Sequence, residues 1–214
     1  MKARSRAGGF MRASREKKNE YSYGDYLLWP DNRRYEIIEG TVYDMMPAPP
    51  PEHQRLLGKL HLKIAGFLKG KDCEVFVAPL DVLLPEADEA DEKVKTVVQP
   101  DLLVVCDPTK ITPRGCRGAP DWIIEVLSPS TASKDQILKR RIYEKAGVRE
   151  YWVIHPTDRT IMIYRLHKAK LAFFDTYDDQ AELKTACLPG LTIAAAEIFQ
   201  PQPKVVREDP MHYV

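Results

Sequence analysis

The chain has 214 residues, of which 44% are hydrophobic and 29% are charged, and it carries a formal net charge of +1. These values are typical of a soluble globular protein with one domain of ordinary size. No apolar run approaches the ~20 residues that a membrane-spanning helix needs, and the basic N-terminus lacks the apolar segment of a secretory signal.

The charge is unevenly distributed along the chain. Residues 1–20 carry a net charge of +5, which leaves about −4 for the remainder. The remainder therefore has no overall basic field, and any nucleic acid must be bound by a local patch. We expect a basic, disordered N-terminal tail over residues 1–20, a single domain over 21–198 and a C-terminal tail over 199–214.

The four cysteines are far apart in the sequence and show no paired metal-ligand spacing; they are Cys73, Cys106, Cys116 and Cys187. A zinc site is therefore the weaker interpretation. We expect four reduced thiols in a cytoplasmic protein.

The first half of the predicted domain combines strands with one long helix. Alternating residues over 35–39 and 41–46, around Gly40, predict a hairpin. Apolar residues at helical spacing over 53–69 predict the long helix. The other expected elements are a short helix at 21–31 and strands at 74–78, 81–84 and 97–105. Pro100 has no N–H for a regular central position and should interrupt the last strand.

The second half begins with a Pro- and Gly-rich segment, residues 107–120, that predicts a loop. The sequence DWIIEVLSPST, residues 121–131, predicts a strand buried on both faces. A helix is expected over 133–146, closed by Gly147. The remaining expected elements are strands at 151–154, 160–166 and 171–177 and a final helical turn or two in GLTIAAAEIF. This order indicates a mixed α/β fold around one central sheet.

Two carboxylates belong to these apolar strands. A lone ionised Glu125 inside its strand is costly, or its pKa shifts until it is neutral. Asp101 opens the other apolar run 24 residues earlier, and the intervening loop is long enough for the two strands to pair. Two carboxylates at one sheet edge repel each other unless a divalent metal or a lysine joins them. Separately, Asp101 also suits a strand-end cap, and Glu125 a buried structural ion pair.

Lys139 is the candidate lysine. It lies four residues after Asp135, so the two share a helix face, which alone would suit an exposed ion pair of about 0.3–0.5 kcal/mol. A lysine that projects back over the sheet edge could instead reach both carboxylates. Carboxylates with an open site suit Mg²⁺, which polarises a phosphate, and a lysine stabilises the charge that develops on the phosphate oxygens. The arrangement suits hydrolysis of a phosphodiester.

These residues carry a resemblance. Pro100-Asp101 followed by Glu125-Val126-Leu127 is similar to the PD-(D/E)XK nuclease pattern, and residues 20–195 resemble the Uma-type restriction endonuclease family, a bacterial group. The residues that carry the resemblance are Tyr35-Glu36-Ile37-Ile38-Glu39-Gly40, His53, Pro100-Asp101, Pro120-Asp121, Glu125 to Thr131, Asp135 to Lys139, Tyr143 and Gly147 to Ile154. The resemblance implies a restriction-endonuclease-like mixed central sheet flanked by helices, with additional antiparallel hairpins.

The resemblance also implies a metal-dependent site for Mg²⁺ or Mn²⁺. Asp101 and Glu125 would be metal ligands, with the main-chain carbonyl of Val126 as a third, and Glu39 would complete the acidic cluster. The general pattern has lysine two residues after the glutamate, but this chain has Leu127 there. In this family the next helix supplies the lysine, which matches Lys139.

Several neighbouring residues have two interpretations each. Glu39 also suits a turn beside Gly40. His53 suits either a base or outer-shell group near the metal or a cap for the first turn of its helix. Tyr143 suits packing against the sheet more than a phosphate contact. Ser128 and Ser130 suit loop and N-cap hydrogen bonds.

Three functions remain open from the sequence. The first is a Mg²⁺- or Mn²⁺-dependent endonuclease that hydrolyses DNA, for which a homodimer would supply one site per strand. The second is a nuclease-fold module that has lost cleavage and serves as a binding or scaffold subunit. The third is a nuclease for RNA or small nucleotides, because nothing in the sequence reads the sugar. No membrane partner is expected.

Overall fold

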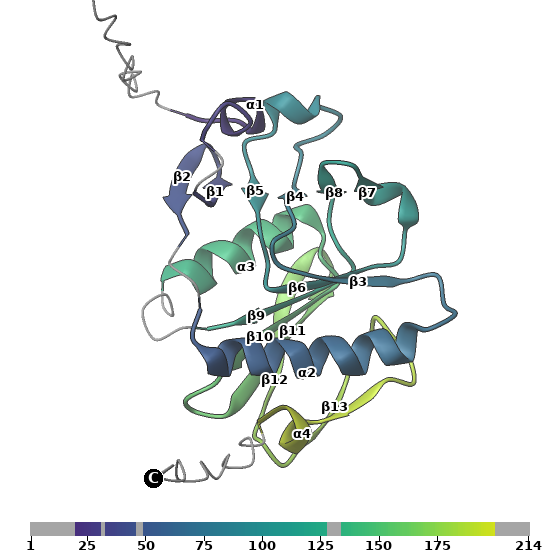
Figure 1. Cartoon of the computed structure of the whole chain (residues 1–214). Helices are drawn as coiled ribbons and strands as arrows, with labels where there is room; N and C mark the ends of the chain where they lie inside the picture. Colours follow the sequence, from purple (N-terminus) through teal and green to yellow (C-terminus); the bar gives the residue numbers. More distant parts are fainter. Residues whose placement is uncertain (1–19, 31–32, 46–48, 128–133, 200–214) are drawn as a thin grey trace, which may run out of the picture.

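The computed structural model describes residues 20–30, 33–45, 49–127 and 134–199, and Figure 1 shows the arrangement of their elements. Its helices are α1 (Tyr23–Tyr26), α2 (Pro51–Leu68), α3 (Lys134–Ala146) and α4 (Ala195–Phe199), with 3₁₀ turns at Asp91–Lys93 and Pro108–Lys110. None of these helices is both long and apolar enough to cross a membrane.

A central sheet of six strands has the order β12-β11-β10-β9-β6-β3. These strands are β3 (Glu74–Val77), β6 (Leu102–Val105), β9 (Trp122–Val126), β10 (Glu150–His155), β11 (Thr160–His167) and β12 (Lys170–Tyr177). β9 runs parallel to β10 and antiparallel to β6, so the sheet is mixed. The predicted α/β fold with a mixed central sheet is confirmed.

A second sheet, here called the peripheral sheet, has the order β2-β1-β5-β4-β8-β7. Its strands are β1 (Tyr35–Ile38), β2 (Thr41–Asp44), β4 (Val82–Leu83), β5 (Val97–Val98), β7 (Ile111–Thr112) and β8 (Gly115–Arg117). The predicted β1–β2 hairpin forms one edge of this sheet. A third sheet pairs β13 (Glu182–Lys184) with β14 (Thr192–Ala194).

Helices cover both faces of the central sheet, with α2 on one side and α3 on the other (Figure 1). Alternation along the strands separates the two cores. Leu102 and Ile124 pack in the α2 core, whereas Leu103 and Ile123 pack in the α3 core. Five buried apolar residues of α2 recur at helical spacing, as the sequence predicts: Leu56, Leu57, Leu60, Ile64 and Leu68.

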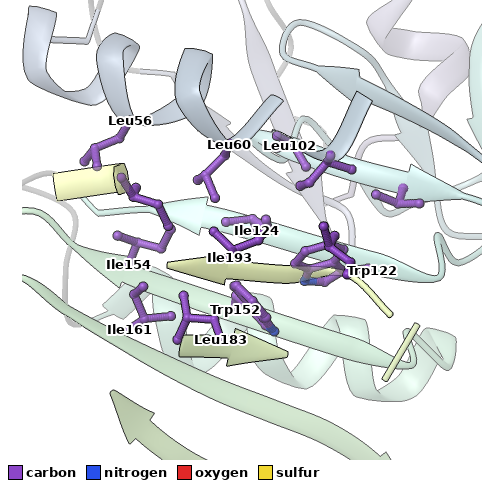
Figure 2. Packing of buried hydrophobic residues seen from close by; sticks show 14 of the residues in the cluster. Leu56, Leu60, Leu102, Trp122, Ile124, Trp152, Ile154, Ile161, Leu183 and Ile193 are labelled. Carbon is purple, nitrogen blue, oxygen red and sulfur yellow. The ribbon is translucent and has the colours of Figure 1, made fainter. Parts of the chain in front are cut away.

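Two tryptophans lie at the centre of the α2 core. Figure 2 shows Trp122 of β9 and Trp152 of β10 beside each other, and their ring centroids are 4.7 Å apart in an edge-to-face arrangement. Leu183 and Ile193 of the small β13–β14 sheet complete this core on the same face of the central sheet as α2. Burial of each such side chain contributes about 1.5–3 kcal/mol, so this layer fixes the position of β9.

The strand expected over 97–105 is two strands in two sheets. β5 ends at Val98 in the peripheral sheet, and β6 begins at Leu102 in the central sheet. Pro100 lies in the crossing segment, where its missing N–H breaks no ladder, and the predicted interruption is confirmed. The chain therefore passes from one sheet to the other immediately before Asp101.

Part of the segment predicted as a loop over 107–120 is strand. β7 and β8 form a hairpin, and β8 adds to the peripheral sheet beside β4. Gly115 allows this approach, because a Cβ there would lie 2.1 Å from the carbonyl oxygen of Asp81, and its φ of 128° strains other residues.

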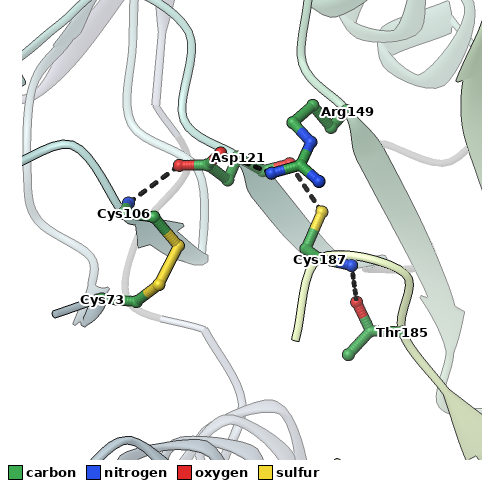
Figure 3. The surroundings of a disulfide bond; sticks show 6 residues. All are labelled: Cys73, Cys106, Asp121, Arg149, Thr185 and Cys187. Carbon is green, nitrogen blue, oxygen red and sulfur yellow. Dashed lines mark hydrogen bonds and ion pairs between the residues drawn. A yellow bond between two sulfur atoms is a disulfide. The ribbon is translucent and has the colours of Figure 1, made fainter. Parts of the chain in front are cut away.

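The expectation of four reduced thiols is wrong for one pair. Cys73 and Cys106 form a disulfide, with sulfurs 2.05 Å apart, beside the Glu74–Val105 pair of β3 and β6 (Figure 3). Cys116 and Cys187 are free and buried, as expected. The expected cytoplasmic location loses the support that it drew from reduced thiols, since disulfides persist mainly in oxidising compartments.

Candidate metal and phosphodiester site

Asp101 and Glu125 lie side by side where the neighbouring strands β6 and β9 of the central sheet come to an end. β6 and β9 pair with Leu102 opposite Ile124, and this register continued by one residue places Asp101 opposite Glu125. The N–H of Val126 donates to Oδ2 of Asp101 at 2.8 Å. Opposite residues of an antiparallel pair project from the same face, so the two carboxylates are neighbours.

Lys139 reaches this cluster from α3, as the sequence analysis anticipates. Its Nζ lies 3.0 Å from Oε1 of Glu125 and 3.0 Å from Oε1 of Glu36. Burial opposes the charge of the lysine, but the carboxylates of Glu125 and Glu36 outweigh this effect and hold its pKa well above the usual value. Lys139 is therefore a cation shared between two buried carboxylates.

Glu36, not Glu39, is the acidic residue that the first hairpin contributes. Glu36 is 7% exposed, and its Oε1 also accepts a hydrogen bond of 2.9 Å from the N–H of Gln99. Glu39 is exposed and occupies the hairpin turn with a φ of 48°. The structure thus leaves Glu39 outside the cluster and places it in the turn that was its alternative interpretation.

His53 and Tyr143 contact the two central carboxylates from opposite sides of the sheet. Nε2 of the buried His53, near the start of α2, lies 3.2 Å from Oδ2 of Asp101. Burial lowers the pKa of this imidazole, but the hydrogen bond and charge of Asp101 outweigh that effect and raise it. The hydroxyl of Tyr143 donates to Oε1 of Glu125 at 2.8 Å. Tyr143 is fully buried, which fits the packing interpretation and a role in holding Glu125.

The charge of this cluster is unbalanced. Burial raises the pKa of Glu125, Lys139 opposes this effect, and the nearby Asp101 and Glu36 add to it, so that the pKa lies at about 7. Lys139 pairs with Glu36 and Glu125, and Asp101 lies beside Glu125, so the cluster contains three carboxylates and one lysine. A bound cation would favour the ionised form of Glu125.

The chemistry of these groups fits a hard divalent cation. Carboxylate oxygens of Asp101 and Glu125, with the main-chain carbonyl of Val126 beside them, are the ligand types that Mg²⁺ and Mn²⁺ prefer. Within the described part of the chain, no three His, Cys, Asp or Glu side chains are grouped as an all-protein metal cage. Mg²⁺ is commonly held by only one or two carboxylates together with water and substrate phosphates, so this donor set suits it.

Two sequence-based interpretations lie outside the described residues. Ser128 and Ser130 fall in the segment 128–133, and the side chain of Asp135 at the start of α3 is also outside the description. The hydrogen bonds expected for these residues therefore stay predictions.

The chain folds as a mixed central sheet with a helix on each face, and Asp101 and Glu125 lie side by side at the ends of two of its strands. A crystal structure from Anabaena variabilis, titled "a putative nuclease belonging to DUF820", shares this fold with a TM-score of 0.67. The two chains are 21% identical, and the match covers 83% of this chain and 97% of the other.

Residues 23–196 match the Uma2 family, which is described as "Putative restriction endonuclease". The chain belongs to this family. The uncharacterized protein slr1290 of Synechocystis sp. is 26% identical over 181 residues, which are 82% of this chain and 90% of that protein.

Proposed function

We propose that the protein is a metal-dependent endonuclease that hydrolyses phosphodiester bonds in DNA. The observation that supports this most is that Asp101, Glu125 and Lys139 lie together at the ends of two sheet strands. Asp101 immediately precedes β6, Glu125 belongs to β9 and Lys139 belongs to α3. Each residue comes from a different element, and no local turn or cap requires them to meet. The family and the fold of the neighbour agree with the same class of reaction.

Asp101 and Glu125, with the carbonyl of Val126, would hold Mg²⁺ or Mn²⁺. The metal, when bound, polarises the scissile phosphate and lowers the pKa of a coordinated water. Lys139 stabilises negative charge on the phosphate oxygens as it develops. His53 fixes Asp101 through the contact at Oδ2, and Tyr143 fixes Glu125 through its hydroxyl.

In this proposal Lys139 also balances the charge of the site, because it is paired with two carboxylates. Without metal, its charge offsets the repulsion between Glu36 and Glu125. A cation held by Glu125 would compete with Lys139 for that carboxylate and would leave the lysine held mainly by Glu36, from which it could reach the substrate. The lysine therefore replaces, from a helix, the residue that the general pattern places where this chain has Leu127.

Plasmid cleavage tests the proposal. Wild-type protein with Mg²⁺ or Mn²⁺ should nick supercoiled DNA, and Asp101→Asn should abolish nicking and weaken Mn²⁺ binding in calorimetry. Asp88→Asn is the matched control, because it makes the same chemical change at an exposed loop position. Equal nicking by the wild-type and Asp101→Asn proteins would identify a contaminant.

A binding or scaffold module without cleavage is the second candidate, and the buried pairing of Lys139 with two glutamates favours it. A lysine that stayed locked in both pairs would be unable to meet a phosphate. This candidate predicts DNA binding without nicking by any metal. Sedimentation of the protein with duplex DNA would also test the proposed homodimer, which double-strand cleavage by one site per strand requires.

A further inference from the structure

Arg34 is held in an unusual way at the start of β1. Its Nε and one Nη donate to the same oxygen, Oε1 of Gln99, at 2.8 and 2.6 Å. Gln99 is neutral, so these bonds fix the guanidinium without cancelling its charge. Arg34 is exposed and forms no ion pair with any carboxylate in the described part of the chain.

Several other arginines of the described chain are paired with carboxylates. Such pairs are Arg33–Asp44, Arg114–Glu92, Arg117–Asp91, Arg149–Asp121 and Arg159–Asp179. A carboxylate partner neutralises the arginine and occupies the donors that an external anion would need. Arg34 therefore keeps the N–H groups that Gln99 does not use, and the charge of Asp81 acts on it only from beyond ion-pair distance.

Gln99 fixes the position of Arg34 relative to the carboxylate cluster. Gln99 is 5% exposed, its main-chain N–H donates to Glu36, and it lies two residues before Asp101. Its side-chain Nε2 donates to Oδ1 of Asp81 at 2.7 Å, which orients the amide so that its oxygen faces Arg34. One buried residue thus connects the acidic cluster to the exposed guanidinium.

The negative charge of the carboxylate cluster would repel a nucleic acid. Glu36, Asp101 and Glu125 outnumber the one lysine among them, and a nucleic acid that approaches them is itself a polyanion. The described domain has no overall basic field, so a local cation must offset the repulsion. A guanidinium presents its N–H groups as a fork that matches two phosphate oxygens.

We propose that Arg34 binds a backbone phosphate of the DNA strand next to the scissile phosphodiester, and that Gln99 holds it there. This inference rests on the proposed function for its substrate, but it concerns affinity and not cleavage. Arg34 acts as a fixed anchor at the rim, and Gln99 is a positioning residue.

Fluorescence anisotropy with a short labelled DNA duplex in metal-free buffer tests the inference. Arg34→Gln removes the charge but can still hydrogen-bond to Gln99. We expect it to weaken binding about tenfold and to reduce the slope of log affinity against log salt concentration by about 1. Arg33→Gln is the matched control. Because Arg33 is already paired with Asp44, its substitution should leave both quantities unchanged.

Arg34→Lys provides a second variant that keeps the charge and loses the fork. It should retain the wild-type salt slope but bind several-fold more weakly, and it decides the question if Arg34→Gln fails to fold by circular dichroism. Wild-type affinity and slope in Arg34→Gln, or wild-type affinity in Arg34→Lys, would overturn the inference. A wild-type protein that binds no duplex would overturn it as well.

Calorimetry with Mn²⁺ on the same variants separates this inference from the proposed function. Arg34→Gln should bind Mn²⁺ as the wild type does, because Arg34 contacts no proposed ligand of the metal. If the wild type binds no Mn²⁺ but loses DNA affinity in Arg34→Gln, the metal-dependent nuclease is refuted and the phosphate contact stands. If Mn²⁺ binds and the variants do not differ on DNA, only the phosphate contact is refuted.

Discussion

The substitution Glu125→Gln should stabilise the metal-free protein at alkaline pH while it abolishes the metal site. Glutamine keeps the side-chain oxygen that accepts from Tyr143 and Lys139 at 2.8 and 3.0 Å. It removes the buried negative charge, whose cost is visible in the raised pKa of Glu125. The substitution should therefore raise the free energy of unfolding and weaken metal binding at the same residue.

The magnitude follows from the pKa. A rise from the ordinary value of 4.5 to about 7 corresponds to about 3–4 kcal/mol, at about 1.4 kcal/mol per pKa unit. Because the folded-state pKa is raised, the protonated carboxyl favours the folded state. This contribution is fully present below a pH of about 4.5 and is lost as the pH rises through about 7. Glu125→Gln has no carboxyl to ionise at this position, so its stability does not fall over this pH range.

Urea unfolding at a series of pH values measures the effect. Relative to the wild type, Glu125→Gln should gain up to about 3–4 kcal/mol of unfolding free energy as the pH rises from about 4.5 to about 7. Glu182→Gln, at an exposed position of β13, should follow the wild-type profile. Saturating Mn²⁺ should remove the pH dependence of the unfolding free energy from the wild type and leave the profile of Glu125→Gln unchanged. Parallel profiles of wild type and Glu125→Gln without metal would refute the reasoning.

Three further predictions concern the lysine, the tyrosine and the disulfide. Lys139→Met should abolish nicking and, because it leaves buried carboxylates unpaired, cost about 3–5 kcal/mol at neutral pH in urea unfolding; an unchanged midpoint would contradict this. Tyr143→Phe removes the hydrogen bond to Glu125 and should lower the free energy of unfolding by about 1–3 kcal/mol and weaken Mn²⁺ binding. Equal Mn²⁺ affinity of the variant and the wild type in calorimetry would contradict this prediction. Replacing Cys73 and Cys106 by serine opens a loop with a separation of 33 residues, and a loss of about 3–4 kcal/mol is expected; a wild-type midpoint under oxidising conditions would argue against it.

The parts of the fold that the sequence predicts well are those with long or distinctive local signals. α2 has five buried apolar residues at helical spacing, and β9 is an apolar run with turn residues on either side. Asp101 and Glu125 stand out because charged groups in such runs need an explanation. Lys139 could be found because it follows one helix turn after Asp135, in a helix expected to begin at about residue 133.

Glu36 was missed because β1 is only four residues long and all four are buried. With both faces covered, alternation does not tell which of two glutamates points toward α3. One signal did distinguish them. Glu39 precedes Gly40 at the centre of a tight turn, where both residues have positive φ, while Glu36 lies inside the strand.

The short strands and the disulfide depend on pairing between distant segments. β7, β8, β13 and β14 have two or three residues each, too few for a periodic pattern. The disulfide requires the β3–β6 register that brings Glu74 opposite Val105, and nothing in the local sequence of either cysteine specifies that register.

The passage of the chain from β5 to β6 has a mechanical consequence. Glu36 is anchored to the peripheral sheet and Asp101 to the central sheet. The main chain around Pro100 and the lysine shared by Glu36 and Glu125 couple the two layers. The core beneath α3 also contains side chains of both sheets, such as Val98 and Leu103. Sliding of one sheet over the other would therefore disrupt this core as well as the spacing of Glu36 and Glu125 on either side of Lys139.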